Sequence, residues 1–367
     1  MKILEVANVD FSLRHFVLPL MRAIRARGHD VIGASADGPL LADIRAEGFR
    51  VEPLPLERNL SLPAQLRAYR ALLALIRREQ PDLVHAHMPL SGFLARLAAR
   101  HAGTPRIAYT GHGFLFNQPG PLSRRAASLA MEWVGARLTD TLLTVSTEEA
   151  ADARRLHLTP RAIPIGNGRD PTRFHPDPAA RARIRTELGT PTDCPVIVAL
   201  SRLVRHKGHP ELLAAMEQVA GAELWVVGAR LPSDHGEDLE PYFARSTLGP
   251  RLRRLGYRAD TQAILAAADI FALPSHFEGL PMSVIEAMLC ALPVVATDIR
   301  GPREQVIPNE TGLLVPPRRV APLAAALNRL VADPALRARM GAAGRRRAET
   351  LYDERLVTAR TLDALGL

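Results

Sequence analysis

Short apolar runs alternate with amphipathic segments along almost the whole chain. In the first half, each run has the length of one strand, and the segments between the runs have helical periodicity. Strands that alternate with helices in this way form a parallel sheet that is covered on both faces. The expected strands are 3–7, 31–34, 49–53, 83–86, 106–110 and 142–146, and the expected helices are 18–27, 40–47, 61–79, 92–102, 121–140 and one that starts at 147.

The alternation resumes after a Gly- and Pro-rich passage, 161–176, which is typical of an interdomain linker. Beyond it we expect helices at 179–188, 264–268, from 281 and from 301, and strands at 196–200, 224–228, 269–273, 293–297 and 312–315. A chain of 367 residues with 47% hydrophobic residues suits two cores better than one. We therefore expect an α/β protein with domains at 1–166 and 167–345, and a helical tail, 346–367, that returns to the first domain.

The positive net charge is spread over many segments. The formal charge is +9 and the sequence pI is near 10.4, but aromatic residues make up only 5%, which argues against a single-strand nucleic-acid binder. We expect no nucleic-acid partner. The basic excess lies mostly before Gly166, so we expect an anionic membrane surface as a peripheral partner. The expected helix from Pro121 carries Arg124 and Arg125 at one end, and either packs on the core or lies on that surface.

Cysteine use and the chain start bear on cofactors and location. Cys194 follows an Asp in an expected loop and Cys290 lies in an apolar helix, so neither a disulfide nor a thiol-bound metal is expected. No group of His and carboxylates has a metal-ligand spacing, and we expect no metal and no other cofactor. No stretch approaches the roughly twenty apolar residues of a membrane span. The first residues read as a strand rather than a signal peptide, so we expect a cytoplasmic protein, peripheral on the inner face of the plasma membrane.

Two histidines follow expected strands of the first domain. Ligands of parallel sheets bind beyond the carboxyl ends of the strands, so these loops are candidate sites. His112 lies between Gly111 and Gly113, which leaves its backbone free and presents its ring to a cleft. His87 directly follows the expected strand 83–86. Both are candidates for substrate contact, and the alternative for each is a packed histidine without a function.

A cluster of cations follows the first strand of the second domain. Arg202 and Lys207 come directly after 196–200, and Gly208 follows the lysine. The chain contains only two lysines, so a lysine at this place is notable. A compact ammonium and a planar guanidinium both suit a phosphate. The alternative is a solvated basic loop, which does not explain the position at a strand end.

The stretch 276–288 combines a strand end, a tight turn and a helix start. Gly279 allows a ligand to approach the backbone closely, and Pro281 stands where a helix begins. The helix start offers free N–H groups to an anion. The N–H donors expected there are those of Leu280, Met282 and Ser283.

Two carboxylates, Glu278 and Glu286, flank this helix start. A charged side chain among apolar neighbours, as at Glu286, costs several kcal/mol unless it has a partner. We therefore expect a specific role for it. The alternative is that Glu278 caps the helix and Glu286 pairs with a buried Arg. Further upstream, Gly256 and the flat side chain of Tyr257, next to Arg258, could form the wall of a base pocket.

These patterns together resemble the large family of retaining, metal-independent GT-B-fold glycosyltransferases that use nucleotide-sugar donors. The similar features are Glu278 and Glu286 with seven residues between them, Arg202 and Lys207 upstream, the junction 166–170, and the segments 301–304 and 311–316. Five such patterns in one order are specific. The resemblance implies a GT-B fold, in which two Rossmann-like, doubly wound parallel-sheet domains face each other across a cleft.

The resemblance also implies roles for the charged candidates. Glu286 would hold the ribose hydroxyls of a nucleotide-sugar donor, and Arg202 with Lys207 would neutralise its diphosphate as it leaves. Glu278 would bind hydroxyls of the transferred sugar. The further contacts implied are the backbone of Gly279 and Leu280 to that sugar, His112 to the donor sugar from the opposite domain, and Tyr257 and Arg258 to the base.

The segment 109–116, with the basic helix after Pro121, is most similar to bacterial members of this family that extend lipid-diphosphate-linked glycans. This implies a UDP-sugar donor, with an N-acetylhexosamine or a hexose, and a polyprenyl-diphosphate-linked acceptor in surface polysaccharide or glycoconjugate synthesis. The first loop, 8–13, lacks the Gly-Gly pair of many relatives, which leaves the acceptor contacts undefined. Two alternatives remain: a UDP-sugar 2-epimerase of similar fold, and a non-catalytic protein that binds lipid or a nucleotide sugar.

Overall fold

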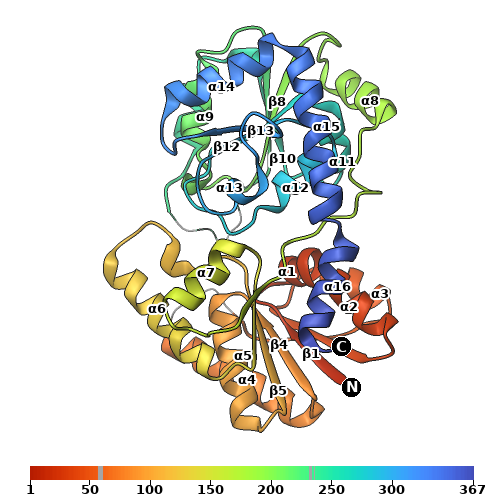
Figure 1. Ribbon diagram of the computed structural model, residues 1–367, viewed down its shortest axis with the longest axis vertical. Coiled ribbons are helices and arrows are strands. Elements are labelled where there is room, and N and C mark those ends of the chain that lie inside the picture. The colour runs from red at the N-terminus through yellow and green to blue at the C-terminus, as the bar shows by residue number, and fades with distance from the viewer. Residues whose placement is uncertain (57–60, 231–233, 235) are drawn as a thin grey trace. The chain divides into compact units, whose positions relative to one another are not determined.

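The computed structural model describes residues 1–56, 61–230, 234 and 236–367. By internal contacts the chain divides into two compact units (Figure 1). Unit 1 comprises Met1–Gly166 and Leu356–Leu367, and unit 2 comprises Asn167–Arg355. Each unit is built on one parallel sheet with helices on both faces. The expected class, an α/β chain with two Rossmann-like parallel-sheet domains, is confirmed.

The sheet of unit 1 has seven strands in the order β3-β2-β1-β4-β5-β6-β7, all parallel. Its strands are β1 Lys2–Val6, β2 Asp30–Ser35, β3 Arg50–Pro53, β4 Leu83–His87, β5 Arg106–Gly111, β6 Thr141–Thr144 and β7 Ala162–Pro164. Its helices are α1 Asp10–Ser12, a π-helix at Leu13–Val17, α2 Leu18–Ala26, α3 Leu41–Ala46, α4 Leu62–Glu79, α5 Pro89–Ala102, a 3₁₀ turn at Leu115–Asn117, α6 Leu122–Arg137, α7 Thr147–Arg155 and α16 Glu354–Leu365.

Consecutive residues of β1 face opposite layers of unit 1. Ile3 belongs to the core formed with α2 and with Leu365 of α16, whereas Leu4 belongs to the core formed with Leu72 of α4. Neither Ile3 nor Leu4 exposes any surface. A strand of a parallel sheet is buried on both faces and so needs apolar residues in sequence. Figure 1 shows α4 and α5 on one side of this sheet and α2 and α16 on the other.

The sheet of unit 2 has six parallel strands in the order β10-β9-β8-β11-β12-β13. Its strands are β8 Val196–Leu200, β9 Glu223–Val227, β10 Leu252–Gly256, β11 Ile270–Leu273, β12 Val294–Thr297 and β13 Gly312–Val315. Its helices are α8 Pro178–Leu188, a 3₁₀ turn at Arg205–Lys207, α9 His209–Met216, α10 Glu240–Arg245, a 3₁₀ turn at Gly249–Arg251, α11 Thr261–Ala267, α12 Met282–Leu289, α13 Pro302–Gln305, α14 Val320–Ala332 and α15 Pro334–Leu351.

The chain end belongs to unit 1 only from Leu356 onwards. The tail expected to begin at 346 starts inside α15, which runs unbroken to Leu351 and packs against α12 of unit 2. The helix that follows, α16, contributes Leu362 and Leu365 to the core of unit 1. Among the described residues, none of the helices is both long and apolar enough to cross a membrane.

In each sheet the strand order reverses next to the first strand of the unit. The chain adds β2 and β3 on one side of β1, and β4 to β7 on the other. In unit 2 it adds β9 and β10 on one side of β8, and β11 to β13 on the other. Doubly wound sheets bind ligands beyond the carboxyl ends of the strands at such a switch point. The loops after β1 and β4, and those after β8 and β11, are therefore the expected ligand-binding loops.

Candidate functional site

Arg202 and Lys207 lie in the loop after β8, at the switch point of unit 2. Gly208 follows them with φ +77°, and a Cβ there would lie 2.0 Å from the carbonyl oxygen of Pro274. Only glycine therefore allows the β8 loop to pack on the loop after β11. His276 N–H donates to the carbonyl of His206 at 2.7 Å, which joins the two loops a second time.

Lys207 and Glu278 form the central pair of this site. Lys207 Nζ lies 2.7 and 2.8 Å from the two carboxylate oxygens of Glu278, whose residue is only 8% exposed. Ser275 Oγ donates to the same carboxylate at 2.6 Å, and Thr297 Oγ1 holds the carbonyl of Ser275 at 2.5 Å. The structure thus brings a cation from the β8 loop and a carboxylate from the β11 loop to one point, as a switch point allows.

The turn 279–281 leads directly from Glu278 into α12. Pro281 is the N-cap residue, and within the described part of the chain no side chain caps the helix. Asn167 Nδ2 donates to the carbonyl of Leu280 at 2.7 Å, and Gln305 Nε2 donates to the carbonyl of Pro281 at 3.0 Å. These bonds fix the turn through its carbonyl groups. The first N–H groups of α12, beginning with Met282, have no partner within the helix, which suits an anion.

Glu286 lies one turn into α12 and is buried among apolar neighbours. Its Oε1 accepts from Arg169 Nε at 2.6 Å. The alternative given for this residue, a buried arginine partner, is therefore present in the structure. Arg169 belongs to the junction segment noted in the sequence, and the pair connects that segment to the helix.

Arg202 forms an ion pair with the buried carboxylate of Asp234. Behind it, His209 Nε2 lies 3.2 Å from the carbonyl of Arg202 and 3.0 Å from Ser201 Oγ. Burial lowers the pKa of His209 to about 4, although its hydrogen bond to the Arg202 carbonyl opposes the shift. The neutral imidazole thus supports the backbone that carries Arg202.

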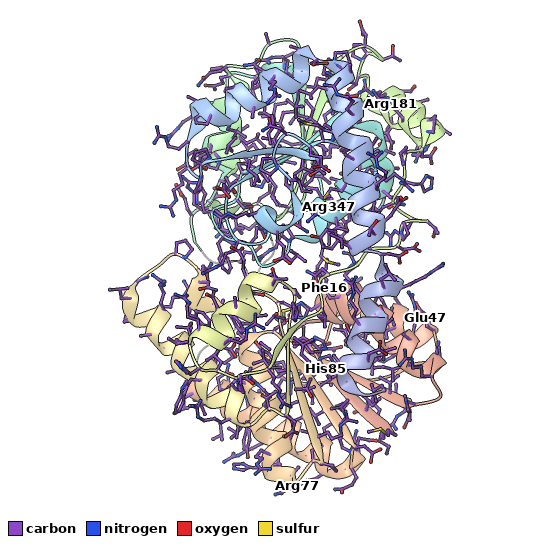
Figure 2. All side chains as sticks on the ribbon, viewed as in Figure 1. Phe16, Glu47, Arg77, His85, Arg181 and Arg347 are labelled. Carbon is purple, nitrogen blue, oxygen red and sulfur yellow. The ribbon has the colours of Figure 1, made fainter. Side chains whose placement is uncertain are left out.

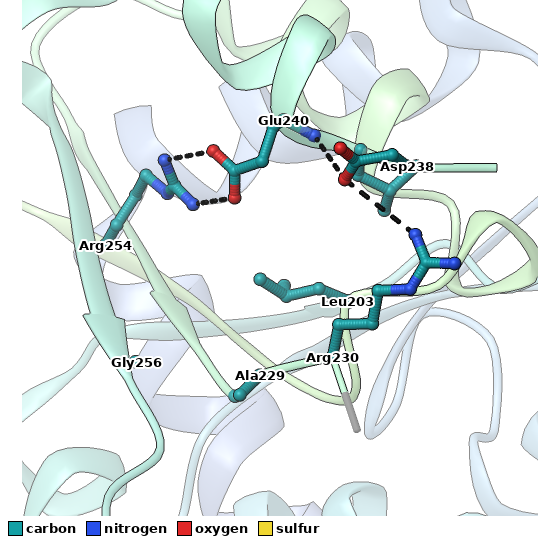
Figure 3. A pocket seen from close by; sticks show the side chains of 9 residues that line it. Leu203, Ala229, Arg230, Asp238, Glu240, Arg254 and Gly256 are labelled. Carbon is teal, nitrogen blue, oxygen red and sulfur yellow. Dashed lines mark hydrogen bonds and ion pairs between the residues drawn. The ribbon is translucent and has the colours of Figure 1, made fainter. Parts of the chain in front are cut away.

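A cavity of about 240 Å³ lies at the carboxyl ends of β8, β9 and β10 (Figure 3). Leu203, Ala229 and Gly256 are among its lining residues. Two ion pairs border it, Arg254 with Glu240 and Arg230 with Asp238 (Figure 3). Its lining therefore combines small and apolar residues with charged ones.

Tyr257 and Arg258 are not among the residues that line this cavity. Tyr257 is 61% exposed. Arg258 forms a bidentate pair with Asp260, in which Nε and Nη2 each donate to one carboxylate oxygen at 2.8 Å. Its Nη1 donates to Glu187 of α8, also at 2.8 Å. These contacts raise the pKa of the guanidinium above its usual value. The base contact of both residues stays a prediction.

Unit 1 has a buried polar cluster at its own switch point. Register places Glu5 of β1 directly beside His85 of β4, and His87 lies two residues further on the same face. Glu5 Oε1 lies 3.1 Å from His85 Nδ1, and Glu5 Oε2 lies 2.7 Å from His87 Nε2. His87 Nδ1 lies 3.1 Å from Nε2 of His112, which follows β5. His85 is labelled among the strands of unit 1 in Figure 2.

The pKa shifts in this cluster follow from burial and from the hydrogen bonds. Burial alone would raise the pKa of Glu5, but His85 and the hydrogen bonds from both histidines lower it to about 2. Burial, followed by repulsion from His85, lowers the pKa of His87 to about 4. Burial, with His87 and His85 nearby, also lowers the pKa of His112 well below its usual range. At neutral pH, Glu5 is ionised and both His87 and His112 are neutral.

Glu5, His85 and His87 are also of the types that bind metals, and their ligand atoms all lie within 4.8 Å of one another. The sequence spacing gave no sign of this group. However, His87 Nε2 lies only 2.7 Å from the carboxylate, whereas two ligands of one tetrahedral zinc, each at about 2.0–2.1 Å, are separated by roughly 3.4 Å. The contact is that of a hydrogen bond. The expectation of no bound metal stays a prediction.

The structure brings some of the predicted residues into contact. Lys207 contacts Glu278 in unit 2, and His87 contacts His112 in unit 1. Arg202 and Glu286 pair with other partners, Asp234 and Arg169. Sequence reasoning missed Glu5 and His85 of unit 1. The available signal was Glu5 inside an apolar strand and the repeat of histidine at positions 85 and 87, which puts both rings on one face. The partners that it missed in unit 2 are Arg169, Asp234 and Ser275.

Two family models match the chain, one after the other. Residues 13–168 match the glycosyl transferase 4-like domain, and residues 180–347 match the glycosyl transferases group 1.

Curated relatives are similar over most of the chain. A GDP-mannose-dependent monoacylated alpha-(1-6)-phosphatidylinositol monomannoside mannosyltransferase of Corynebacterium glutamicum is 32% identical, over 98% of this chain and 94% of the relative. A UDP-Gal:alpha-D-GlcNAc-diphosphoundecaprenol alpha-1,3-galactosyltransferase of Escherichia coli is 31% identical, over 72% of this chain and 70% of the relative.

Among solved structures, Anabaena HepE in complex with UDP and glucose superposes with a TM-score of 0.87 at 23% identity, over 100% of this chain and 99% of that chain. A sucrose-phosphate synthase from Thermosynechococcus elongatus also has a TM-score of 0.87, at 24% identity, over 100% and 98%. At these identities the likeness shows a common fold.

Proposed function

Because the chain belongs to the GT-B-fold glycosyltransferases, we propose that it moves a sugar from a UDP-sugar to a glycan acceptor by a retaining, metal-independent reaction. The transferred sugar is an N-acetylhexosamine or a hexose. The acceptor is linked to polyprenyl diphosphate and belongs to surface polysaccharide or glycoconjugate synthesis. The observation that carries this proposal is the Lys207–Glu278 pair, at the switch point of unit 2 and at the start of α12.

Glycosyl transfer breaks the bond between the anomeric carbon and the donor diphosphate, so negative charge develops on the leaving phosphate. Lys207 and Arg202 follow β8, and the free N–H groups of α12 follow β11. Cations and a helix start placed at that oxygen stabilise the charge without a divalent ion. Glu278, next to these groups, then accepts hydrogen bonds from hydroxyls of the transferred sugar.

In this proposal the base lies in the cavity lined by Leu203 and Gly256. Glu286 of α12, which pairs with Arg169, accepts from the ribose hydroxyls. HepE, which has the same fold, is solved with UDP and with UDP-glucose, and the galactosyltransferase of Escherichia coli is named for a UDP-Gal donor and a diphosphoundecaprenol acceptor. These names support the choice of a UDP-sugar and of a polyprenyl acceptor.

The donor experiment uses the purified chain with a panel of nucleotide sugars in excess EDTA. Nucleotide release is measured with and without a polyprenyl-diphosphate-linked sugar as acceptor. We expect release that requires the acceptor, survives EDTA and is largest with one UDP-sugar. Conversion of the nucleotide sugar without acceptor would instead indicate an epimerase, and loss of release in EDTA would contradict a metal-independent reaction.

The lipid-linked acceptor requires the protein to reach a membrane, and α6 offers a surface for this. Leu122 and Trp133 of α6 are exposed, and Arg124 and Arg125 lie in its first turn. We propose that this basic, partly apolar helix binds anionic lipid. Its attraction is electrostatic, so binding to phosphatidylserine-containing vesicles should fall steeply as salt rises.

Two double variants test the role of α6 in lipid binding. Each replaces two adjacent arginines, one pair in unit 1 and one pair in unit 2. Arg124→Ser with Arg125→Ser should reduce vesicle binding, whereas Arg318→Ser with Arg319→Ser, at an exposed site of unit 2, should leave it nearly unchanged. Equal loss in both double variants would show that net charge, rather than α6, determines binding.

A further inference from the structure

The polar cluster of unit 1 forms a chain of hydrogen bonds that ends at His112. Glu5 has no exposed surface, His87 is buried, and His112 is partly exposed. The chain therefore leads from a carboxylate inside the sheet to a ring at its carboxyl edge. Among the described residues, none donates to or accepts from His112 Nδ1.

The positions of the protons in this chain follow from its ends. The ionised carboxylate of Glu5 can only accept, so the proton of its 2.7 Å contact belongs to Nε2 of His87. A neutral imidazole carries one N–H, which makes Nδ1 of His87 an acceptor. The 3.1 Å contact from this atom to His112 then requires a proton on Nε2 of His112. Nδ1 of His112 is left without a proton.

The other bonds of the cluster agree with this order. His85 Nδ1 donates to the second oxygen of Glu5, and Thr110 Oγ1 lies 2.8 Å from His85 Nε2. Glu5 thus receives two N–H donors from the neighbouring strand β4 and has no proton to give back. The two rings beside it are fixed in the same way that a buried carboxylate fixes a catalytic histidine.

The backbone next to His87 is held in a strained conformation. Met88 has φ 65° and ψ 153°, a region that is almost restricted to glycine. Ser91 Oγ donates to the carbonyl of His87 at 3.0 Å, and Gly92 N–H donates to the carbonyl of Met88 at 2.9 Å. Strain of this kind persists only where the surroundings impose it. The two hydrogen bonds fix the backbone next to the ring of His87, which lies between Glu5 and His112.

We propose that Glu5 and His87 are positioning residues that hold His112 in the Nε2–H tautomer, so that its Nδ1 accepts a hydrogen bond from a hydroxyl of the substrate. This inference rests on the proposed function and on the contact of His112 with the donor sugar that the resemblance to the family implies. An acceptor nitrogen selects a group that can donate, which a hydroxyl does.

The first test is the tautomer of His112 in the whole protein, observed by NMR after labelling histidine with ¹⁵N. A ring nitrogen with a proton and one without differ widely in ¹⁵N chemical shift, and the signal is assigned by its loss in His112→Asn. We expect a proton on Nε2 and none on Nδ1. A proton on Nδ1 in the wild type would overturn the proposal without any variant.

The second test removes the carboxylate with Glu5→Leu. Without this acceptor nothing fixes the proton of His87 on Nε2, so we expect both tautomers of His87, and therefore both tautomers of His112, to appear. The matched control is Thr110→Val in the same buried cluster. Among the described residues its hydroxyl contacts His85 alone, and we expect this variant to keep the wild-type tautomer. An unchanged tautomer in Glu5→Leu would overturn the proposal. If that variant does not fold, His87→Phe replaces it, and both tautomers should then appear at His112.

Turnover at saturating donor separates this inference from the proposed function. We expect Glu5→Leu to lower turnover roughly five- to tenfold, the factor that one hydrogen bond supplies, and Thr110→Val to stay within about twofold of wild type. If the predicted tautomers are observed but no transfer activity is found, the positioning of His112 by Glu5 and His87 is supported and the proposed function is refuted. If Glu5→Leu leaves the transfer activity unchanged, the positioning role of Glu5 is refuted and the proposed function is retained.

Discussion

Each charged candidate of unit 2 is paired with an opposite charge from a distant part of the chain. Arg202 pairs with Asp234, Lys207 with Glu278, and Glu286 with Arg169, at sequence separations of 32, 71 and 117 residues. Buried or half-buried ions need such partners because an isolated charge is costly there. Substitution of one member therefore affects two groups.

Lys207→Ala tests the contribution of the ammonium to catalysis. We expect turnover to fall about a hundredfold or more, since removal of one donor that stabilises a leaving or oxyanionic oxygen has an effect of this size. The measurement is nucleotide release at saturating donor and acceptor. Lys207→Arg keeps the charge but not the compact shape, and we expect an intermediate rate.

The chain supplies a natural control for this variant. Its only other lysine, Lys2, lies in β1 of unit 1 and donates to the carbonyl of Glu79 at 2.8 Å. Lys2→Ala should leave turnover nearly unchanged. Turnover of Lys207→Ala close to that of wild type would refute the role of the ammonium in stabilising the leaving group.

The sequence indicated residue types at strand ends but not their partners. Lys207 and Glu278 could be predicted as site residues because each follows an apolar strand and neighbours a glycine. That the two bind each other could not, because the contact depends on β8 and β11 being adjacent in the sheet. Glu5 was missed for the same reason, since its role exists only through the register of β1 with β4.

At the scale of elements, the strongly periodic segments were predicted well. The strand expected at 196–200 is β8, and the helix expected at 61–79 is α4, Leu62–Glu79. Less regular elements escaped prediction. The π-helix Leu13–Val17 depends on how the first loop packs. The strand β10 has only two apolar side chains, those of Leu252 and Leu255, to indicate a strand. A hydrophobic pattern in the sequence reflects which residues of an element are buried. In neither of these elements do buried residues recur at the spacing of a regular helix or strand.

Packing between α5, α6 and β5 depends on a buried arginine. Arg96 has no exposed surface and lies over the ring of Tyr109, with its Cζ 3.8 Å from the ring centroid. Its Nη2 lies 3.1 Å from Glu132, which also accepts from the Tyr109 hydroxyl at 3.0 Å. The guanidinium lies against Gly135 of α6, where a Cβ would be 2.5 Å from Cζ.

Gly135→Ala should therefore destabilise unit 1 although alanine favours helices. The added methyl group meets a side chain that is fixed on three sides, and overpacking of this kind costs about 1–3 kcal/mol, more than the roughly 1 kcal/mol gained in helix propensity. The free energy of unfolding is measured in urea. Gly120→Ala is the control, because its Cβ would have only Arg124 nearby, at 4.0 Å. Equal stability of both variants would show that Arg96 can move aside.

At the scale of the whole molecule, the two units use the same construction. Each places polar and charged side chains at the carboxyl ends of the two strands that flank its switch point, β1 and β4 in one and β8 and β11 in the other. The alternation of strands and helices was enough to predict both sheets, because a right-handed crossover restricts how such a chain can fold. The alternation does not predict which side chains of different strands lie next to each other, because that depends on the register of the strands.

Both units also bury neutral histidines, which makes stability depend on pH in each. The pKa of His87 in unit 1 and that of His209 in unit 2 are both lowered from 6.5 to about 4 in the folded state, in each case mainly by burial. Between pH 6.5 and 4 the unfolded chain binds a proton at each of these positions and the folded chain does not. Protonation therefore stabilises the unfolded state, and the free energy of unfolding falls as pH falls.

We expect each unit to lose roughly 1–3 kcal/mol of stability from its buried histidine between pH 7 and pH 4.5. Below pH 4.5 the loss continues, because Glu5 and Glu211, whose pKa values are lowered to about 2, stay ionised in the folded state while the unfolded chain is protonated. The measurement is urea unfolding at several pH values, with the two units followed separately by hydrogen exchange. His209→Gln should reduce the pH dependence in unit 2 alone and leave the part that comes from His206, whose pKa burial also lowers to about 4. The same change at the exposed His175 is the control. Stability that is constant from pH 7 to pH 4.5 would mean that these histidines are not held neutral by the fold.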